Sequence, residues 1–134
     1  MRYCKLCGST ENIQAHHIVS RKQQPALIKC KHNLVDLCAD CHVLAPNAVH
    51  NNGFKELKKL RLEKQREYYK LFELKYYPKD IVKELLGISQ KDVDMLLKPV
   101  KNLAGFYERE DIIRACMGGK ILIDVGEILW IHRL

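Results

Sequence analysis

Two pairs of cysteines in this chain have the spacing of metal ligands. Cys4 and Cys7 form one C-x2-C pair, Cys38 and Cys41 form a second, and 30 residues separate the two pairs. A two-residue spacer lets both thiolates of a pair reach one ion, and two such pairs complete the tetrahedron that Zn2+ prefers. We therefore predict a structural zinc ion with four protein ligands and no open position. Any chemistry then requires another metal.

Further residues between and just after these pairs suit the hydrolysis of a phosphodiester. They are the pair His16 and His17, then Asn33, and finally His42 directly after the last cysteine. Such hydrolysis requires a deprotonated water, a cation that neutralises the phosphate oxygens, and relief of charge on the leaving 3′ oxygen. Neutral imidazoles serve both as metal ligands and as general bases near pH 7. The residue types therefore favour a hydrolytic metal site.

The order of these motifs resembles the HNH nuclease family. The resemblance covers roughly residues 1–53 and is carried by AHHIV, NLVDLC and the CxxCH that ends at His42. It implies a metal-dependent DNA endonuclease that leaves a 5′-phosphate and a 3′-hydroxyl. It also implies that His16 and His42 hold the catalytic divalent metal. By the same resemblance, His17 activates the water and Asn33 orients the loop that carries His17.

The identity of the second metal and the role of His50 stay open at this point. The first position of the histidine pair is often Asp in the family, and a His there resembles the nuclease colicins, so Mg2+, Mn2+, Ni2+ and Zn2+ are all candidates. Family members with CHxxxH carry a histidine four residues after the last motif histidine, whereas His50 follows His42 by eight. The extra length is about one helical turn. His50 is therefore a candidate ligand if the helix continues through Pro46, and otherwise a solvated side chain.

The net charge of +7 is concentrated in the N-terminal part of the chain. Residues 1–75 contain 14 Lys and Arg against 7 Asp and Glu, whereas residues 76–134 contain 9 of each kind. This imbalance predicts double-stranded DNA as a partner of the first part, although charge alone equally suits solubility. The predicted phosphate contacts are Arg21, Lys22, Lys29, Lys31, Lys58 and Arg61. A solvated helix face is the alternative for the last two.

The elements that must position these side chains predict an α+β fold. Short strands at 13–19 and 33–38 form a small ββα-metal zinc module over residues 1–53, and a helix can begin after the second cysteine pair. Residues 54–77 lack Gly and Pro and are rich in helix formers, which predicts one long basic connecting helix. Modules of this size bury too little apolar surface to be stable alone, which gives the zinc a structural purpose.

Residues 78–134 are predicted to form a small, mainly helical module that resembles a winged helix. The predicted order is a helix, a turn at Gly87, a helix capped by Ser89, a strand at 105–107, a third helix, and an apolar strand or packing segment at 120–134. The segment 81–98 resembles the helix-turn-helix of excisionase and MerR-type proteins, which implies DNA binding. Asp92 and Asp94 equally suit protein binding or packing, so DNA and protein both remain possible partners.

The resemblance favours an endonuclease on the homing or phage-type site-specific plan. The alternatives are a non-catalytic zinc-stabilised DNA-binding protein, which would tolerate the loss of His17, and a regulatory protein that binds another protein through residues 78–134. No apolar stretch has the length of a secretory signal or a membrane span. We therefore expect a cytoplasmic protein that uses neither a membrane nor a small-molecule cofactor. Four residues match no motif. We interpret His32 and His132 as structural or exposed, and Cys30 and Cys116 as ordinary small apolar residues.

Overall fold

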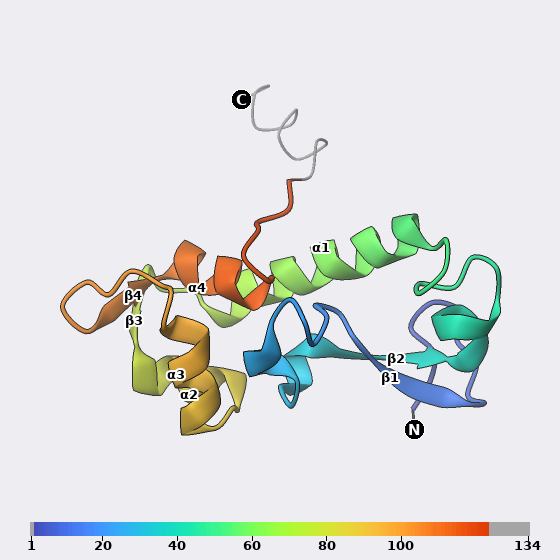
Figure 1. Ribbon diagram of the computed structural model, residues 1–134, viewed down its shortest axis with the longest axis horizontal. Helices are drawn as coiled ribbons and strands as arrows, with labels where there is room; N and C mark the ends of the chain where they lie inside the picture. The colour runs from blue at the N-terminus through green and yellow to red at the C-terminus, as the bar shows by residue number, and fades with distance from the viewer. Residues whose placement is uncertain (1, 124–134) are drawn as a thin grey trace.

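A computed structural model of the chain describes residues 2–123, which form a mixed α+β structure as the sequence predicts (Figure 1). The strands are β1 (Ile13–His17), β2 (Leu34–Cys38), β3 (Tyr76–Pro78) and β4 (Phe106–Glu108). The α-helices are α1 (Phe54–Leu71), α2 (Lys79–Leu86), α3 (Gln90–Leu97) and α4 (Arg109–Cys116). Short helical turns occupy Pro25–Leu27, Lys31–Asn33 and Asp40–Leu44, and the last of these is a π-helical turn. Within the described residues, no helix combines the length and apolar character needed to cross a membrane.

Strands β1 and β2 form the antiparallel pair that positions the candidate site. In their register Gln14 lies opposite Leu37 and His16 lies opposite Val35. Because side chains alternate along a strand, Gln14 and His16 share one face of this pair. Both strands confirm the prediction, although β1 ends at His17 rather than at residue 19.

Helix α1 runs along the long axis of the molecule, above β1 and β2 and toward β3 and β4 at the left (Figure 1). It ends at Leu71, so the prediction of a helix through residue 77 was wrong for its last six residues. The chain leaves the helix because Phe72 turns into the core, where it is fully buried and packs edge-on against Tyr77 with ring centroids 5.4 Å apart. The hydroxyl of Tyr77 accepts a 2.7 Å hydrogen bond from the backbone N–H of Leu74, which closes the turn.

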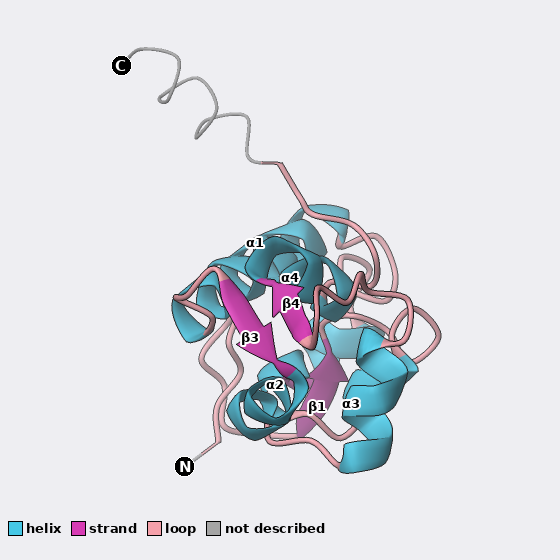
Figure 2. Cartoon of the chain, turned by 90° about the vertical axis from the view of Figure 1, so that its left-hand side faces the viewer, coloured by secondary structure: helices cyan, strands magenta, loops and turns pink. Residues whose placement is uncertain are grey.

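Helices α2 and α3 follow the predicted pattern closely. Gly87 adopts the left-handed backbone conformation (φ +65°) that ends α2, and its N–H bonds the carbonyl of Lys83 at 2.9 Å. Ser89 caps α3 by accepting a 3.1 Å hydrogen bond from the N–H of Asp92. These two local signals fix the turn between the helices, which lie beside each other in Figure 2.

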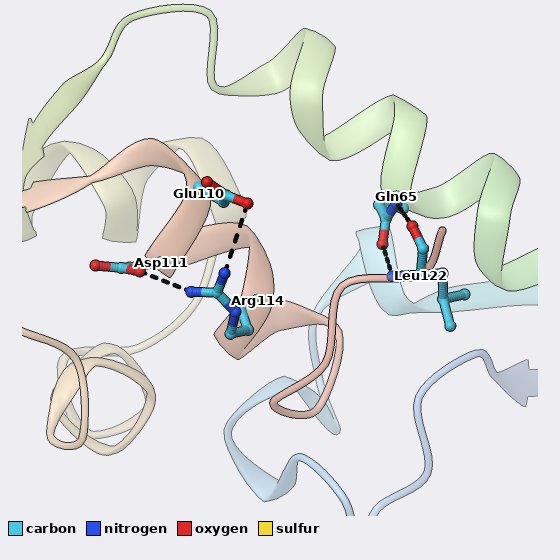
Figure 3. Close-up of polar contacts among 5 residues, drawn as sticks. All are labelled: Gln65, Glu110, Asp111, Arg114 and Leu122. Carbon is cyan, nitrogen blue, oxygen red and sulfur yellow. Dashed lines mark hydrogen bonds and ion pairs between the residues drawn. The ribbon is translucent and has the colours of Figure 1, made fainter. Parts of the chain in front are cut away.

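The second sheet and the last helix complete this part of the chain. Strand β4 pairs with β3 so that Tyr77 and Tyr107, both buried, lie opposite each other. The predicted third helix is α4, in which Arg114 donates to Asp111 at 2.8 Å and pairs with Glu110 at 3.5 Å (Figure 3). These pairs lie one helical turn apart, where charged partners support a helix.

The segments predicted as two modules pack around one shared core. The loop after β1 contributes four buried residues to the core cluster that includes α2, α3 and α4: Val19, Ala26, Leu27 and Cys30. Three hydrogen bonds to backbone carbonyls cross the same junction: Gln24 to Ala115 at 2.7 Å, Cys30 to Leu86 at 3.4 Å, and His32 to Leu85 at 3.2 Å. Most residues of this loop are polar, but its apolar side chains join the first 53 residues firmly to the rest.

Gln65 holds the end of the described chain against α1. Its amide donates to the carbonyl of Leu122 at 2.9 Å and accepts from the N–H of Leu122 at 2.7 Å (Figure 3). The side chain therefore pairs with the backbone as a neighbouring strand would. Ile121 and Leu122 pack on the core without forming a strand. The remainder of the predicted strand, and His132, lie outside the described residues.

Candidate metal centres

Four cysteine thiols meet where β1 begins and β2 ends. Their sulfur atoms all lie within 4.8 Å of one another, and Sγ of Cys7 is 3.6 Å from Sγ of Cys38. Sulfurs bound to one Zn2+ at about 2.3 Å stand roughly 3.8 Å apart in a tetrahedron, whereas disulfide sulfurs are about 2.05 Å apart. The four predicted ligands are thus brought together at the spacing of a zinc site rather than of disulfides.

The backbone around the cysteines holds this arrangement and prepares it electrostatically. Gly8, in the left-handed conformation (φ +79°), closes the first turn by donating to the carbonyl of Cys4 at 2.9 Å. Burial raises the pKa of the Cys4 thiol, but N–H groups of Cys38, Cys7 and Leu6 outweigh that effect and lower this pKa to about 6. Burial instead raises the pKa of Cys41, so Cys4 is the thiol of these two that ionises more readily, and the thiolate is the form that binds a metal.

Three imidazole rings form a second group beside the first. His16 comes from β1, His42 from the π-helical turn and His50 from the loop after it. Their ligand nitrogens all lie within 4.8 Å of one another, and Nε2 of His42 is 2.8 Å from Nε2 of His50. Nitrogens bound tetrahedrally to one ion at about 2.05 Å stand roughly 3.3 Å apart. A small separation of His42 and His50 would therefore make room for a divalent metal.

His16 supplies the clearest sign that this group suits a cation. Its side chain is 4% exposed, and neither ring nitrogen has a hydrogen-bond partner among the described residues. Burial, followed by the nearby His42 and His50, lowers the pKa of His16 to about 4. The ring is therefore neutral at pH 7 and has a lone pair to offer. Buried polar atoms are almost always partnered, and a metal ion would give the unprotonated nitrogen of His16 a partner.

His50 joins the group by a different route from the one predicted. The helical turn ends at Leu44, and the condition of a helix continuing through Pro46 is not met. The chain instead reverses, so that His50 N–H donates to the carbonyl of His42 at 3.2 Å. The amide of Asn51 secures the reversal by donating to two carbonyls of the turn, at 2.8 and 3.0 Å.

Gly53 allows the returning loop to pack closely against the start of α1. A Cβ atom at this position would lie 2.6 Å from the carbonyl oxygen of Asn47 and 2.9 Å from the backbone of Ala48. Backbone atoms cannot move aside as a flexible side chain can, so only glycine fits here. The tight packing fixes the short segment that carries His50.

His17 and Asn33 lie on either side of the loop that follows β1. The Nε2 atom of His17 is 3.0 Å from the carbonyl oxygen of Ile28, so Nε2 carries the proton and Nδ1 is the basic nitrogen. Asn33 is buried, accepts from Val19 N–H at 2.9 Å, and donates to the carbonyls of Val19 and Leu27 at 2.9 and 3.3 Å. The loop directly after His17 is therefore held by Asn33.

The histidines share a pocket with two of the predicted phosphate contacts. Arg21 and Lys22 line a pocket of about 410 Å³ together with His16, His17, His42 and His50. Three other predicted contacts are exposed: Lys29, Lys31 and Lys58. Arg61 differs, because its half-buried guanidinium donates to Ile18 O at 3.1 Å and to Gln23 Oε1 at 3.0 Å. This side chain ties α1 to the loop after His17.

Sequence reasoning missed Gln14, whose Oε1 lies 2.7 Å from Nδ1 of His42. An exposed glutamine in a strand has no signal that distinguishes it, except that it lies two residues before His16 and so on the same face. Cys30 and Cys116 are buried core residues, as interpreted from the sequence. His32 is structural, since it bonds the end of α2.

No family model, no curated protein and no solved structure matches this chain. The fold and the two side-chain groups define a small α+β protein with a candidate four-cysteine zinc site and a candidate three-histidine metal site. The function of the second site has to be inferred from the chemistry of its residues.

Proposed function

We propose that the protein is a metal-dependent endonuclease that hydrolyses phosphodiester bonds in double-stranded DNA. In this proposal Cys4, Cys7, Cys38 and Cys41 hold a structural zinc ion, and His16, His42 and His50 hold one divalent metal. His17 is the general base, and Asn33 positions the loop that follows it. The proposal agrees with the HNH-type order of motifs that the sequence resembles.

One observation carries the proposal. His16 buries two ring nitrogens without a partner, and it does so beside two more imidazoles and within the same pocket as His17. A purely structural histidine would be expected to find a hydrogen-bond partner when buried. A group of ligands next to a free basic nitrogen is the arrangement that metal-assisted hydrolysis requires.

His17 has the properties of a general base. The carbonyl of Ile28 fixes its tautomer and leaves Nδ1 free to accept a proton from water. His17 is only partly buried and lines the pocket, so water and a phosphate can reach it. A base positioned in this way typically contributes about 10² to 10⁴ in rate.

The ligand set favours particular ions. When bound, the metal would neutralise the phosphate oxygens and stabilise the charge of the leaving 3′ oxygen. No carboxylate belongs to the three-histidine group in the described chain, and imidazole nitrogens suit Zn2+ or Ni2+ better than the hard, oxygen-preferring Mg2+. We therefore expect Ni2+, Zn2+ or Mn2+ to support cleavage at lower concentrations than Mg2+ does.

DNA is the proposed substrate because two cationic side chains line the pocket. Arg21 and Lys22 line it, and neither has an ion pair or a hydrogen bond from its side chain within residues 2–123. Their charges are therefore available to phosphates on either side of the scissile bond. Residues 78–134 contain 9 Lys and Arg against 9 Asp and Glu, and we propose that they contact either DNA or a protein partner.

The test is cleavage of a supercoiled plasmid by the wild-type protein and by His17→Ala, after chelation and re-addition of Mg2+, Mn2+, Ni2+ or Zn2+. We expect metal-dependent nicking or linearisation, reduced about 10² to 10⁴-fold in the variant. Zinc content and the unfolding midpoint of the variant should stay close to those of the wild type.

A second histidine provides the control. His32→Ala removes an imidazole that lies outside the pocket, so it should keep wild-type cleavage at a temperature where it is folded. If His17→Ala cuts as fast as the wild type, His17 is not the base. If the wild type retards DNA in a gel but cuts neither the plasmid nor a library of random sequences, the protein is a zinc-stabilised DNA-binding protein instead.

A further inference from the structure

His42 has a ring nitrogen that a neighbouring side chain fixes in place. Its Nδ1 lies 2.7 Å from Oε1 of Gln14. Because an amide oxygen can only accept a hydrogen bond, Nδ1 of His42 carries the proton. The neutral ring then has an unprotonated Nε2, and this atom faces the other imidazoles, 2.8 Å from Nε2 of His50. In that contact the Nε2–H of His50 is the donor.

The other two imidazoles are held differently. His16 has no hydrogen-bond partner at either nitrogen in the described structure, and its position is set by burial. His50 is exposed, and its ring contacts His42. The hydrogen bond from His42 to Gln14 is therefore the contact that selects a tautomer in this group before any ion binds.

Strand β1 places Gln14 where it can bond His42, and Gln14 contributes little else to the structure. It lies two residues before His16 in β1, on the same face of the hairpin, and the π-helical turn brings His42 over that face. Its side chain is exposed and makes no other hydrogen bond within residues 2–123. A single exposed hydrogen bond adds little to stability, because water competes for both partners. The effect of Gln14 is therefore on the orientation of His42 and not on the fold.

We infer that Gln14 is a positioning residue that fixes the tautomer of His42 and thereby presents Nε2 of His42 as a metal ligand. The use of that ligand rests on the proposed function, but the tautomer does not. A partner on the second nitrogen of a metal-binding histidine sets the orientation of the ring, and its loss typically lowers metal affinity about 10 to 100-fold. A neutral amide does this without reducing the positive charge of the ion.

The first measurement is the affinity for Ni2+ by calorimetry, with zinc already bound at the cysteines. Gln14→Leu keeps the size of the side chain but cannot accept a hydrogen bond, so Ni2+ should bind about 10 to 100-fold more weakly. Gln14→Glu restores an acceptor and should bind Ni2+ at least as tightly as the wild type. The control is Gln90→Leu, which removes an exposed glutamine of α3 that lies outside the pocket and should leave the affinity unchanged.

The second measurement needs no metal at the histidines. Long-range 1H–15N NMR of the imidazoles should show His42 protonated at Nδ1 in the wild type and in Gln14→Glu, and a mixture of tautomers in Gln14→Leu. A His42 tautomer that is the same in Gln14→Leu as in the wild type overturns the inference, as does an unchanged Ni2+ affinity. If the tautomer shifts but the wild type binds no Ni2+, the role of Gln14 is supported and the proposed metal site is overturned.

Discussion

Asn33 satisfies both backbone groups of Val19 and one of Leu27 from a fully buried position. No apolar side chain can replace these bonds, and each buried group left without a partner costs about 1 to 3 kcal/mol. We therefore expect Asn33→Ala to lower the free energy of unfolding by about 2 to 4 kcal/mol, measured by urea denaturation. It should also lower the proposed cleavage activity, because the loop after His17 is then no longer held by the hydrogen bonds of Asn33.

Asn33→Asp separates hydrogen bonding from size. The carboxylate can accept from Val19 N–H, but it cannot donate to the two carbonyls, and it buries a charge. This variant should be no more stable than Asn33→Ala. The control is Asn52→Ala, an exposed position at which the change should stay within about 0.5 kcal/mol. A loss below 1 kcal/mol in Asn33→Ala would show that the loop is held by its apolar contacts instead.

The sequence predicted that the four cysteines come together, because ligands of one ion must converge and the spacing of a C-x2-C pair carries this information locally. Gln14 and Arg61 could not be assigned in this way, because the partners of both lie far along the chain. Arg61 was predicted as a DNA contact from its charge alone, whereas burial and two internal hydrogen bonds determine what its guanidinium contacts.

At the scale of elements, the π-helical turn joins the two candidate metal centres. It carries Cys41 and His42 as consecutive residues, and the returning loop bonds both of their carbonyls, through Val49 and His50. The core beneath the turn is small, and its buried residues are Cys4, Leu37, Cys38, Val49 and Leu60. So few apolar side chains stabilise the region weakly, and a zinc ion at the four cysteines would supply much of the remainder.

Removing zinc should therefore disorder the histidine site without a change at any histidine. We expect chelation, or Cys41→Ser, to lower the local stability by several kcal/mol. Hydrogen exchange should then become fast at the amides of Lys5, Val49 and His50, which bond backbone across this region. The amide of Val93 in α3 provides the internal control and should stay protected. Slow exchange at Val49 and His50 in the zinc-free protein would show that the turn folds without its ion.

The ends of helices were predictable from the sequence where caps and turns mark them, and less so where tertiary packing determines where a helix ends. Gly87 and Ser89 marked the ends of α2 and α3 correctly. The end of α1 had no such mark, because the burial of Phe72 stops the helix and this burial depends on β3 and β4. The route of His50 was missed for a similar reason, since the chain reversal depends on Asn51 and Gly53 rather than on helix propensity.

For the whole molecule, the decisive feature is the core that its two parts share. Leu27 is fully buried in the short helical turn that packs against α3, although most residues of the stretch 20–33 are polar. The apolar residues around it, in the sequence PALIKC, were the available signal for this packing. Because this loop also follows His17, the C-terminal helices support the candidate site directly and are not an independent appendage.

A shared core predicts that the protein unfolds as one unit. Leu27→Ala should lower the free energy of unfolding by about 2 to 5 kcal/mol, whereas Leu44→Ala, at a position that is 68% exposed, should change it by less than about 0.5 kcal/mol. Calorimetry of the zinc-loaded protein should give one transition, with equal calorimetric and van't Hoff enthalpies, in the wild type and in Leu27→Ala. Two transitions, of which Leu27→Ala shifts one alone, would instead assign the two parts of the chain to independent domains. In that case the helices α2 to α4 could not fix the loop after His17, and the site would have to rely on zinc and Asn33.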